Sequence, residues 1–77
     1  MSHNEPQTER SMIIFVNGQE TQVSNGHTAH DLLLDLGFER RPVAVEVNKE
    51  VIPRALLPSR VLCEHDQIEV VTLVGGG

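Results

Sequence analysis

One short segment of this chain has the pattern of an amphipathic helix, and it limits the possible folds more than any other feature. In T-A-H-D-L-L-L-D-L-G, residues 28–37, the Thr28 side chain is suited to cap the first turn. Asp31, at the third helical position, can bond back to the Thr28 backbone N–H. Gly37 is suited to the left-handed backbone conformation that commonly ends a helix. The expected apolar stripe is Ala29, Leu32, Leu33 and Leu36. A helix of this length can cover one face of a small sheet and little else.

Most of the remaining chain has the alternating pattern of β-strands. M-I-I-F-V-N, the tight-turn pair Asn17-Gly18 and E-T-Q-V predict a hairpin before the helix. After the helix, V-A-V-E-V-N alternates with period two, and Q-I-E-V-V-T-L-V predicts the last strand. Between these two, V-I-P predicts a short strand that Pro53 confines to an edge or a strand end, and A-L-L-P-S-R predicts at most one helical turn.

The order of these elements predicts an α+β fold. Two strands, one main helix and two or three further strands fit a β-grasp, in which a mixed four- to five-stranded sheet wraps around its helix. The first and last strands are expected to pair in parallel, because the intervening helix then makes a right-handed crossover. We expect a disordered leader over residues 1–11, the β-grasp domain over residues 12–74 and a flexible glycine tail over residues 75–77.

Composition excludes several classes of protein. The lone Cys63 excludes a disulfide framework, a structural zinc cluster and a cysteine-held iron–sulfur centre, so a reducing cytoplasm is the expected location. No apolar run approaches the roughly 18 residues that span a bilayer. The net charge is −5 and the basic residues are scattered, which makes nucleic acid and membrane poor partners. From Val61 onward the charged side chains are all acidic, so a partner that grips this end should offer positive charge.

Side chains with catalytic or metal-binding chemistry have simpler explanations here. His27 and His30 lie beside a helix cap with no third ligand nearby, so no metal site is expected. Cys63 is expected to be inert, because its acidic neighbours disfavour the thiolate. A solvated rim, and no acid–base set, is expected from Glu64, Asp66 and Glu69. We therefore expect no catalytic residue in this chain.

The outward faces of the first and last strands predict a partner interface. If the even-numbered residues of both strands face the helix, Ile13 and Phe15 point outward in the first strand, and Val71 and Leu73 do so in the last. Because these strands are neighbours in a β-grasp, the four side chains are expected to form one exposed patch that leads to the tail. The alternative is that a small open sheet leaves some apolar surface exposed.

The sequence V-T-L-V-G-G-G suggests chemistry at its last residue. Gly75 and Gly76 have no Cβ, so they suit a chain that passes through a narrow channel and delivers the carboxylate of Gly77. A carboxylate is a poor electrophile, but an ATP-using partner can convert it into an acyl-adenylate, with that partner supplying Mg²⁺ and positive groups for the phosphates. The alternative is a flexible stub or a cloning remnant.

These features together resemble the ThiS-like sulfur carriers of thiamin biosynthesis, which are relatives of ubiquitin. The resemblance covers about residues 12–77 and rests on I-I-F-V-N-G, T-A-H-D-L-L-L-D-L-G, V-A-V-E-V-N-K-E-V-I-P-R and D-Q-I-E-V-V-T-L-V-G-G-G. The V-x-V-N-x-x-V-P-R-like stretch favours this carrier over its cousins. One departure is His65, where such carriers commonly have a glycine; histidine tolerates a positive φ better than most residues.

The resemblance implies that the chain is a protein co-substrate and not an enzyme. A ThiF-like adenylyltransferase would adenylate Gly77 with its own ATP and Mg²⁺, a sulfur donor would convert the adenylate to a thiocarboxylate, and a ThiG-like thiazole synthase would take the sulfur. No cofactor of its own is implied. The alternatives are the small subunit of molybdopterin synthase, a ubiquitin-like modifier joined to lysines, and a non-catalytic β-grasp interaction module.

Overall fold

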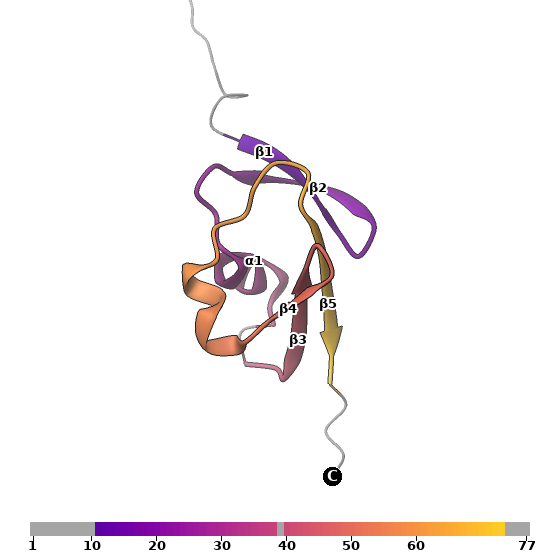
Figure 1. Cartoon of the computed structure of the whole chain (residues 1–77), viewed down its shortest axis with the longest axis vertical. Coiled ribbons are helices and arrows are strands. Elements are labelled where there is room, and N and C mark those ends of the chain that lie inside the picture. The colour runs from indigo at the N-terminus through magenta and orange to yellow at the C-terminus, as the bar shows by residue number, and fades with distance from the viewer. Residues whose placement is uncertain (1–10, 39, 74–77) are drawn as a thin grey trace, which may run out of the picture.

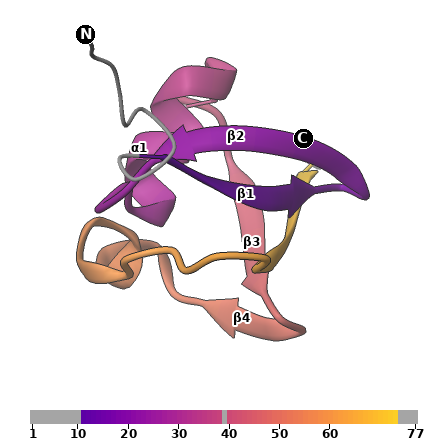
Figure 2. The ribbon, with the colours of Figure 1, turned by 90° about the horizontal axis from the view of Figure 1, so that it is seen from above.

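The computed structural model describes residues 11–38 and 40–73, which form one mixed sheet packed against a helix. In chain order the elements are β1 (Ser11–Val16), β2 (Gln19–Ser24), α1 (Ala29–Leu36), β3 (Val43–Val47), β4 (Glu50–Ile52), the 3-10 helix η2 (Arg54–Ser59) and β5 (Gln67–Thr72). The strand order is β2-β1-β5-β3-β4, with β1 parallel to β5 and every other pair antiparallel. Figure 1 shows the arrangement, and Figure 2 shows α1 and η2 on the same side of the sheet. The predicted β-grasp is confirmed.

The core lies between the inner face of the sheet and the two helices. Burial alternates along β1, with Met12, Ile14 and Val16 buried and the residues between them half-buried. This alternation follows from the two-residue period of a strand. The other buried apolar side chains are Val23, Ala29, Leu32, Leu33, Val45, Val47, Ile52, Leu57, Leu62, Ile68 and Val70. The core is thus almost wholly aliphatic.

The helix begins and ends as its sequence predicts, but its last leucine does not pack. The Thr28 side chain accepts from the Asp31 N–H and the Asp31 side chain accepts from the Thr28 N–H, while Gly37 has φ 80°. Leu36 is 40% exposed, so its predicted place in the apolar stripe is wrong. Phe38 packs against the core instead, because the left-handed Gly37 turns the chain back and the Phe38 N–H bonds the Leu33 carbonyl at 2.9 Å.

Two hairpin turns have the same conformation. Asn17 and Gly18 have φ 51° and 83°, and Asn48 and Lys49 have φ 53° and 72°. Positive φ at both central residues is the requirement of a type I′ turn, whose twist matches the flanking strands. The predicted Asn17-Gly18 hairpin is confirmed. The short strand β4 lies at the edge of the sheet, as Pro53 predicts, whereas η2 is longer than the single turn expected.

The described residues bear on the predicted domain limits at one point. Ser11 is the first residue of β1, so the predicted leader ends one residue too late. The rest of that leader and the predicted tail at residues 75–77 lie outside the described residues. Within residues 11–38 and 40–73, no helix is long and apolar enough to cross a membrane.

Candidate functional site

Strand β5 is the element that precedes the glycines at which the sequence predicts chemistry. It lies in the middle of the sheet, with β1 on one side and β3 on the other, and Figure 1 shows β5 pointing toward the end of the domain that lies away from the start of β1. Gly75, Gly76 and Gly77 lie outside the described residues. The part of the candidate site that has a described geometry is therefore β5 and the surface around it.

The start of β5 is fixed by a buried aspartate. Asp66 is 7% exposed. One of its oxygens accepts from the Cys63 N–H at 2.8 Å and the other from the Asn48 side-chain amide at 2.9 Å. The Asn48 side-chain oxygen in turn accepts from the Gln67 N–H at 2.9 Å. Because a buried carboxylate must have its hydrogen bonds satisfied, Asp66 has a structural role, and its predicted place in a solvated rim is wrong.

The middle of β5 is held by a second asparagine. The last registered pair between β1 and β5 joins Val16 to Ile68. Beyond it, the Asn17 side chain accepts from the Val70 N–H at 2.9 Å and donates to the Val70 carbonyl at 3.3 Å. The Asn17 side chain therefore supplies the next hydrogen bonds to β5, at a point where the β1 backbone no longer pairs with it.

The end of β5 is held by β3. Thr72 lies opposite Val43, and the Leu73 N–H bonds the Pro42 carbonyl at 2.8 Å. The strand is thus supported up to the last residue that the structure describes. The sheet therefore fixes the position of Leu73.

The predicted outer patch divides into two separate parts. Phe15 lies opposite Gln67, so Val71 is four residues farther along β5, or about 13 Å at strand rise. Exposed Gln67 lies beside Phe15, and exposed Glu69 lies between Gln67 and Val71 on the same face. The prediction of one continuous patch is therefore wrong, although each of the four side chains is on the outer face as expected.

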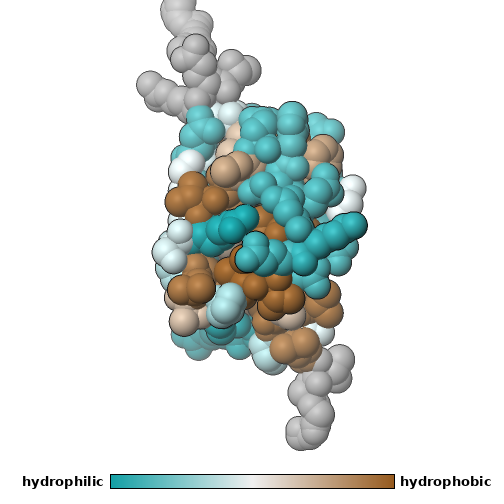
Figure 3. All heavy atoms as spheres, in the orientation of Figure 1, coloured by the Kyte–Doolittle hydropathy of each residue, from teal (hydrophilic) through white to brown (hydrophobic). Residues whose placement is uncertain are grey.

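The two parts also differ in exposure. Ile13 and Phe15 are half-buried, and the Phe15 ring lies 6.3 Å from the His65 ring. Val71 and Leu73 are 53% and 51% exposed. In the view of Figure 3, apolar surface gathers in the half of the molecule where the described chain ends, and the other half is mainly hydrophilic. The part nearest the C-terminus is thus the more accessible one.

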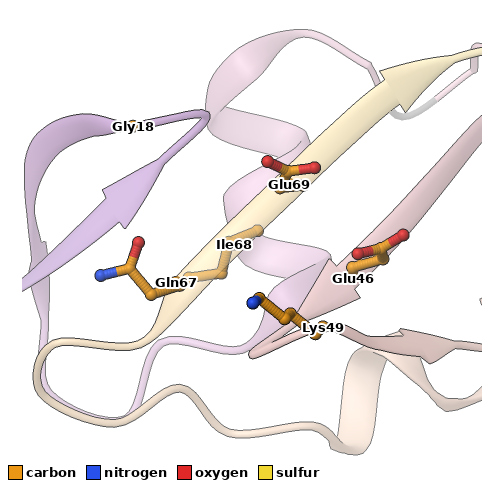
Figure 4. A pocket seen from close by; sticks show the side chains of 6 residues that line it. All are labelled: Gly18, Glu46, Lys49, Gln67, Ile68 and Glu69. Carbon is orange, nitrogen blue, oxygen red and sulfur yellow. The ribbon is translucent and has the colours of Figure 1, made fainter.

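A hollow of about 620 Å³ lies on the outer face between the two type I′ turns. Figure 4 shows the residues that line it: Gly18, Glu46, Lys49, Gln67, Ile68 and Glu69. Glu46 and Glu69 are directly opposite each other in the β3–β5 register, and neither forms an ion pair within the described part of the chain. The hollow carries an acidic pair with one lysine near it.

The remaining candidates for metal or nucleophilic chemistry do not converge. His27 bonds Asp35 at 2.7 Å through its Nε2. Cys63 is a free, exposed cysteine. In residues 11–38 and 40–73, the His, Cys, Asp and Glu side chains form no group of three or more that could hold a metal ion.

The sequence pattern predicts a turn at Asn17 but not the hydrogen bonds that Asn17 and Asn48 form with β5. The available signal was an asparagine at the first central position of two tight turns. Which strand lies beside each turn depends on the complete sheet, and so local patterns did not reveal the hydrogen bonds to β5.

Comparisons with known proteins agree with the fold. The model of the ThiS family matches residues 5–77. A segment of the thiazole synthase of Magnetococcus marinus is 47% identical over 66 residues, which is 86% of this chain and 20% of that protein. The sulfur carrier protein ThiS of Escherichia coli is 30% identical over 66 residues, 86% of this chain and 100% of that protein. The chain thus spans about a fifth of the length of the thiazole synthases it matches.

A solved structure extends this likeness to three dimensions. The thiamine biosynthesis protein (ThiS) from Geobacter metallireducens superposes with a TM-score of 0.71 and 29% identity. The match covers 86% of this chain and 100% of that one. The family match begins at residue 5, earlier than the resemblance at about residue 12 that the sequence motifs suggest. The chain belongs to the ThiS family.

Proposed function

We propose that this chain is a sulfur carrier for the thiazole ring of thiamin and that it acts through the carboxylate of Gly77. The observation that carries the proposal is the family match over residues 5–77, which includes β5 and the three glycines after it. The ThiS protein of Escherichia coli, named a sulfur carrier, is matched over its whole length and supports the same role.

The proposed chemistry starts with activation of the carboxylate. A ThiF-like enzyme, using its own ATP and Mg²⁺, lets a Gly77 carboxylate oxygen attack the α-phosphorus of ATP, so that pyrophosphate leaves and an acyl-adenylate forms. A sulfur donor then displaces AMP and leaves a thiocarboxylate. The thiocarboxylate is a softer nucleophile than a carboxylate, which suits it to deliver sulfur to a ThiG-like thiazole synthase. The chain is then a co-substrate of these enzymes.

The geometry of β5 supports a role as a co-substrate that is modified by other enzymes. Asn17 and β3 hold the strand up to Leu73, four residues before Gly77 in the sequence. Gly75 and Gly76 have no side chains to obstruct a narrow active site. That thiazole synthases of other organisms contain a segment similar to this chain supports thiazole synthase as the sulfur acceptor.

Intact mass spectrometry tests the proposal. The chain is incubated with ATP, a ThiF-like enzyme and a sulfur donor, and we expect one oxygen-to-sulfur exchange that maps to the C-terminal peptide. A variant that lacks Gly76 and Gly77 keeps all of β5 and should remain unmodified. An unmodified wild-type chain with a competent enzyme contradicts the proposal, and isopeptide adducts on lysines would identify a modifier instead.

A second assay distinguishes a carrier for thiazole synthase from the small subunit of molybdopterin synthase. The thiocarboxylate form is offered to a thiazole synthase and to the large subunit of molybdopterin synthase. We expect sulfur transfer to the thiazole synthase. Transfer to molybdopterin synthase alone would show that the chain is the small subunit of that enzyme.

A further inference from the structure

The last residues of β5 have an open backbone edge on the side of β1. The Ile68 carbonyl bonds the Asn17 N–H, and the Val70 N–H and carbonyl bond the Asn17 side chain, so the even-numbered residues of β5 face β1. Leu73 faces the other way and bonds Pro42. By strand alternation, the N–H and carbonyl of Thr72 lie on the β1 side, where no described residue pairs with them.

This edge lacks the protection that the two outer edges of the sheet possess. Edge strands are commonly guarded by charge, by proline or by being short. The outer strand β4 has three residues and is followed by Pro53, and the outer strand β2 carries the exposed Glu20. The V-V-T-L end of β5 has neither charge nor proline. An unguarded edge of this kind is suited to pairing with another chain.

The position of this edge identifies its occupant, if the function proposed above holds. The four residues after Leu73 span at most about 14 Å when fully extended. An enzyme that acts on Gly77 must therefore reach the end of β5, beside Thr72. We propose that the open edge at Thr72 receives an extended main-chain segment of the activating enzyme, which adds to the sheet as a strand beside β5.

The neighbouring side chains indicate the character of that segment. Val71 and Leu73 are about half exposed on the outer face, on either side of Thr72 in the sequence. A strand added beside β5 places alternate side chains on this face, next to those two residues. The segment should therefore carry apolar residues at those alternate positions and supply a backbone N–H and carbonyl to Thr72.

A proline substitution removes the hydrogen-bond donor of the open edge. Thr72→Pro deletes an N–H that bonds no described residue, so the fold should survive, which urea unfolding checks. With a ThiF-like enzyme and ATP, the KM for the Thr72→Pro chain should rise at least about tenfold with little change in kcat, because one interfacial hydrogen bond is lost and the strand is blocked. The control is Gln22→Pro, which places a proline at an outward-facing N–H of the outer strand β2 and should match the wild type.

Hydrogen exchange tests the same edge in the unaltered chain, including the case in which Thr72→Pro does not fold. The Thr72 amide should exchange at least about tenfold more slowly when the enzyme is present without ATP. The Val70 amide, already bonded to Asn17, serves as the internal reference. Unchanged Thr72 exchange overturns the proposal, as does an unchanged KM in a folded Thr72→Pro chain.

Two further outcomes are separable. If slow Thr72 exchange appears in the concentrated chain alone, the occupant is a second copy, and the proposal is overturned. If the enzyme does not adenylate the wild-type chain at all, the proposed function fails. If the wild type is adenylated but neither Thr72 exchange nor the KM of Thr72→Pro changes, the edge proposal alone is overturned and the proposed function is retained.

Discussion

At the scale of single residues, the asparagines in the two type I′ turns supply hydrogen bonds that a neighbouring backbone would otherwise supply to β5. Asn17 and Asn48 have φ 51° and 53°, a region that asparagine adopts more readily than most residues. Their side-chain amides bond the β5 backbone at Val70 and Gln67. The turn conformation explains a small polar residue at each position, and the bonds to β5 explain why it carries an amide.

Removing the Asn17 side chain should destabilise the domain. Asn17→Gly keeps the positive φ at little cost but leaves the N–H and carbonyl of nearly buried Val70 without their partner, so we expect a loss of about 1–3 kcal/mol in the free energy of unfolding. Asn17→Asp retains the acceptor and should lose less. Urea unfolding measures both variants, and a Gly variant as stable as the wild type would refute the role assigned to Asn17.

His65 shows how far a single residue could be predicted. Its place in C-E-H-D, where related carriers commonly have a glycine, indicated a positive φ, and the structure has φ 68°. The His65 N–H also bonds the Ile13 carbonyl at 2.6 Å, which ties this loop to β1. That bond joins residues 52 positions apart, and no local pattern indicates it.

At the scale of elements, local signals predicted the order of strands and helix, and the errors arose where distant segments meet. The hairpin, the helix caps and the edge position of β4 all depend on short stretches of sequence, and all are confirmed. Phe38, which follows the helix-ending Gly37, packs against the core, whereas the Leu36 side chain is exposed. The single outer patch failed because alternation predicts the face of a side chain but not the register between β1 and β5.

The helix cap should make stability depend on pH in the acid range. The Thr28 backbone N–H holds the pKa of Asp31 below its ordinary value of 3.8. A lowered pKa in the folded state means that the stabilisation is complete above pH 3.8 and is lost as the pH falls through the folded value. Asp31→Asn should therefore destabilise the domain at pH 7, and its deficit should shrink below pH 3.8.

Urea unfolding at a series of pH values checks this prediction. Thr28→Ala, which removes the other half of the capping box, should cost about 1 kcal/mol at pH 7. A difference between the wild type and Asp31→Asn that stays constant from pH 7 to pH 3 would show that the carboxylate does not contribute as a cap.

At the scale of the whole molecule, stability should depend on one cooperative core. Leu33 and Leu34 are adjacent in α1, but Leu33 is 1% exposed and Leu34 is 42% exposed. Leu33→Ala should cost about 2–5 kcal/mol, because it leaves a cavity in a domain whose total stability is of the order of 5–15 kcal/mol. Leu34→Ala should change the free energy of unfolding by less than about 1 kcal/mol. Equal losses in the two variants would contradict the assigned helix face.

The charge of the molecule should make its encounter with the proposed activating enzyme sensitive to salt. The net charge is −5, and Glu46 and Glu69 face outward together on the neighbouring strands β3 and β5. An enzyme that binds ATP and a carboxylate has a positive active site, so attraction should lower the KM for this chain at low ionic strength. Between about 50 and 500 mM salt, screening should raise that KM about tenfold or more with kcat little changed.

The double variant Glu46→Gln/Glu69→Gln locates the charge responsible. It should begin with a higher KM at low salt and show a flatter salt dependence, because the outer face near β5 then keeps Lys49 without the two carboxylates. Glu20→Gln/Glu50→Gln removes the same charge from the two outer strands and is the matched control. Since both variants have the same net charge, a flatter slope in the first alone assigns the attraction to the acidic pair beside β5. Equal slopes in the two variants would show that the enzyme responds to total charge and not to this face.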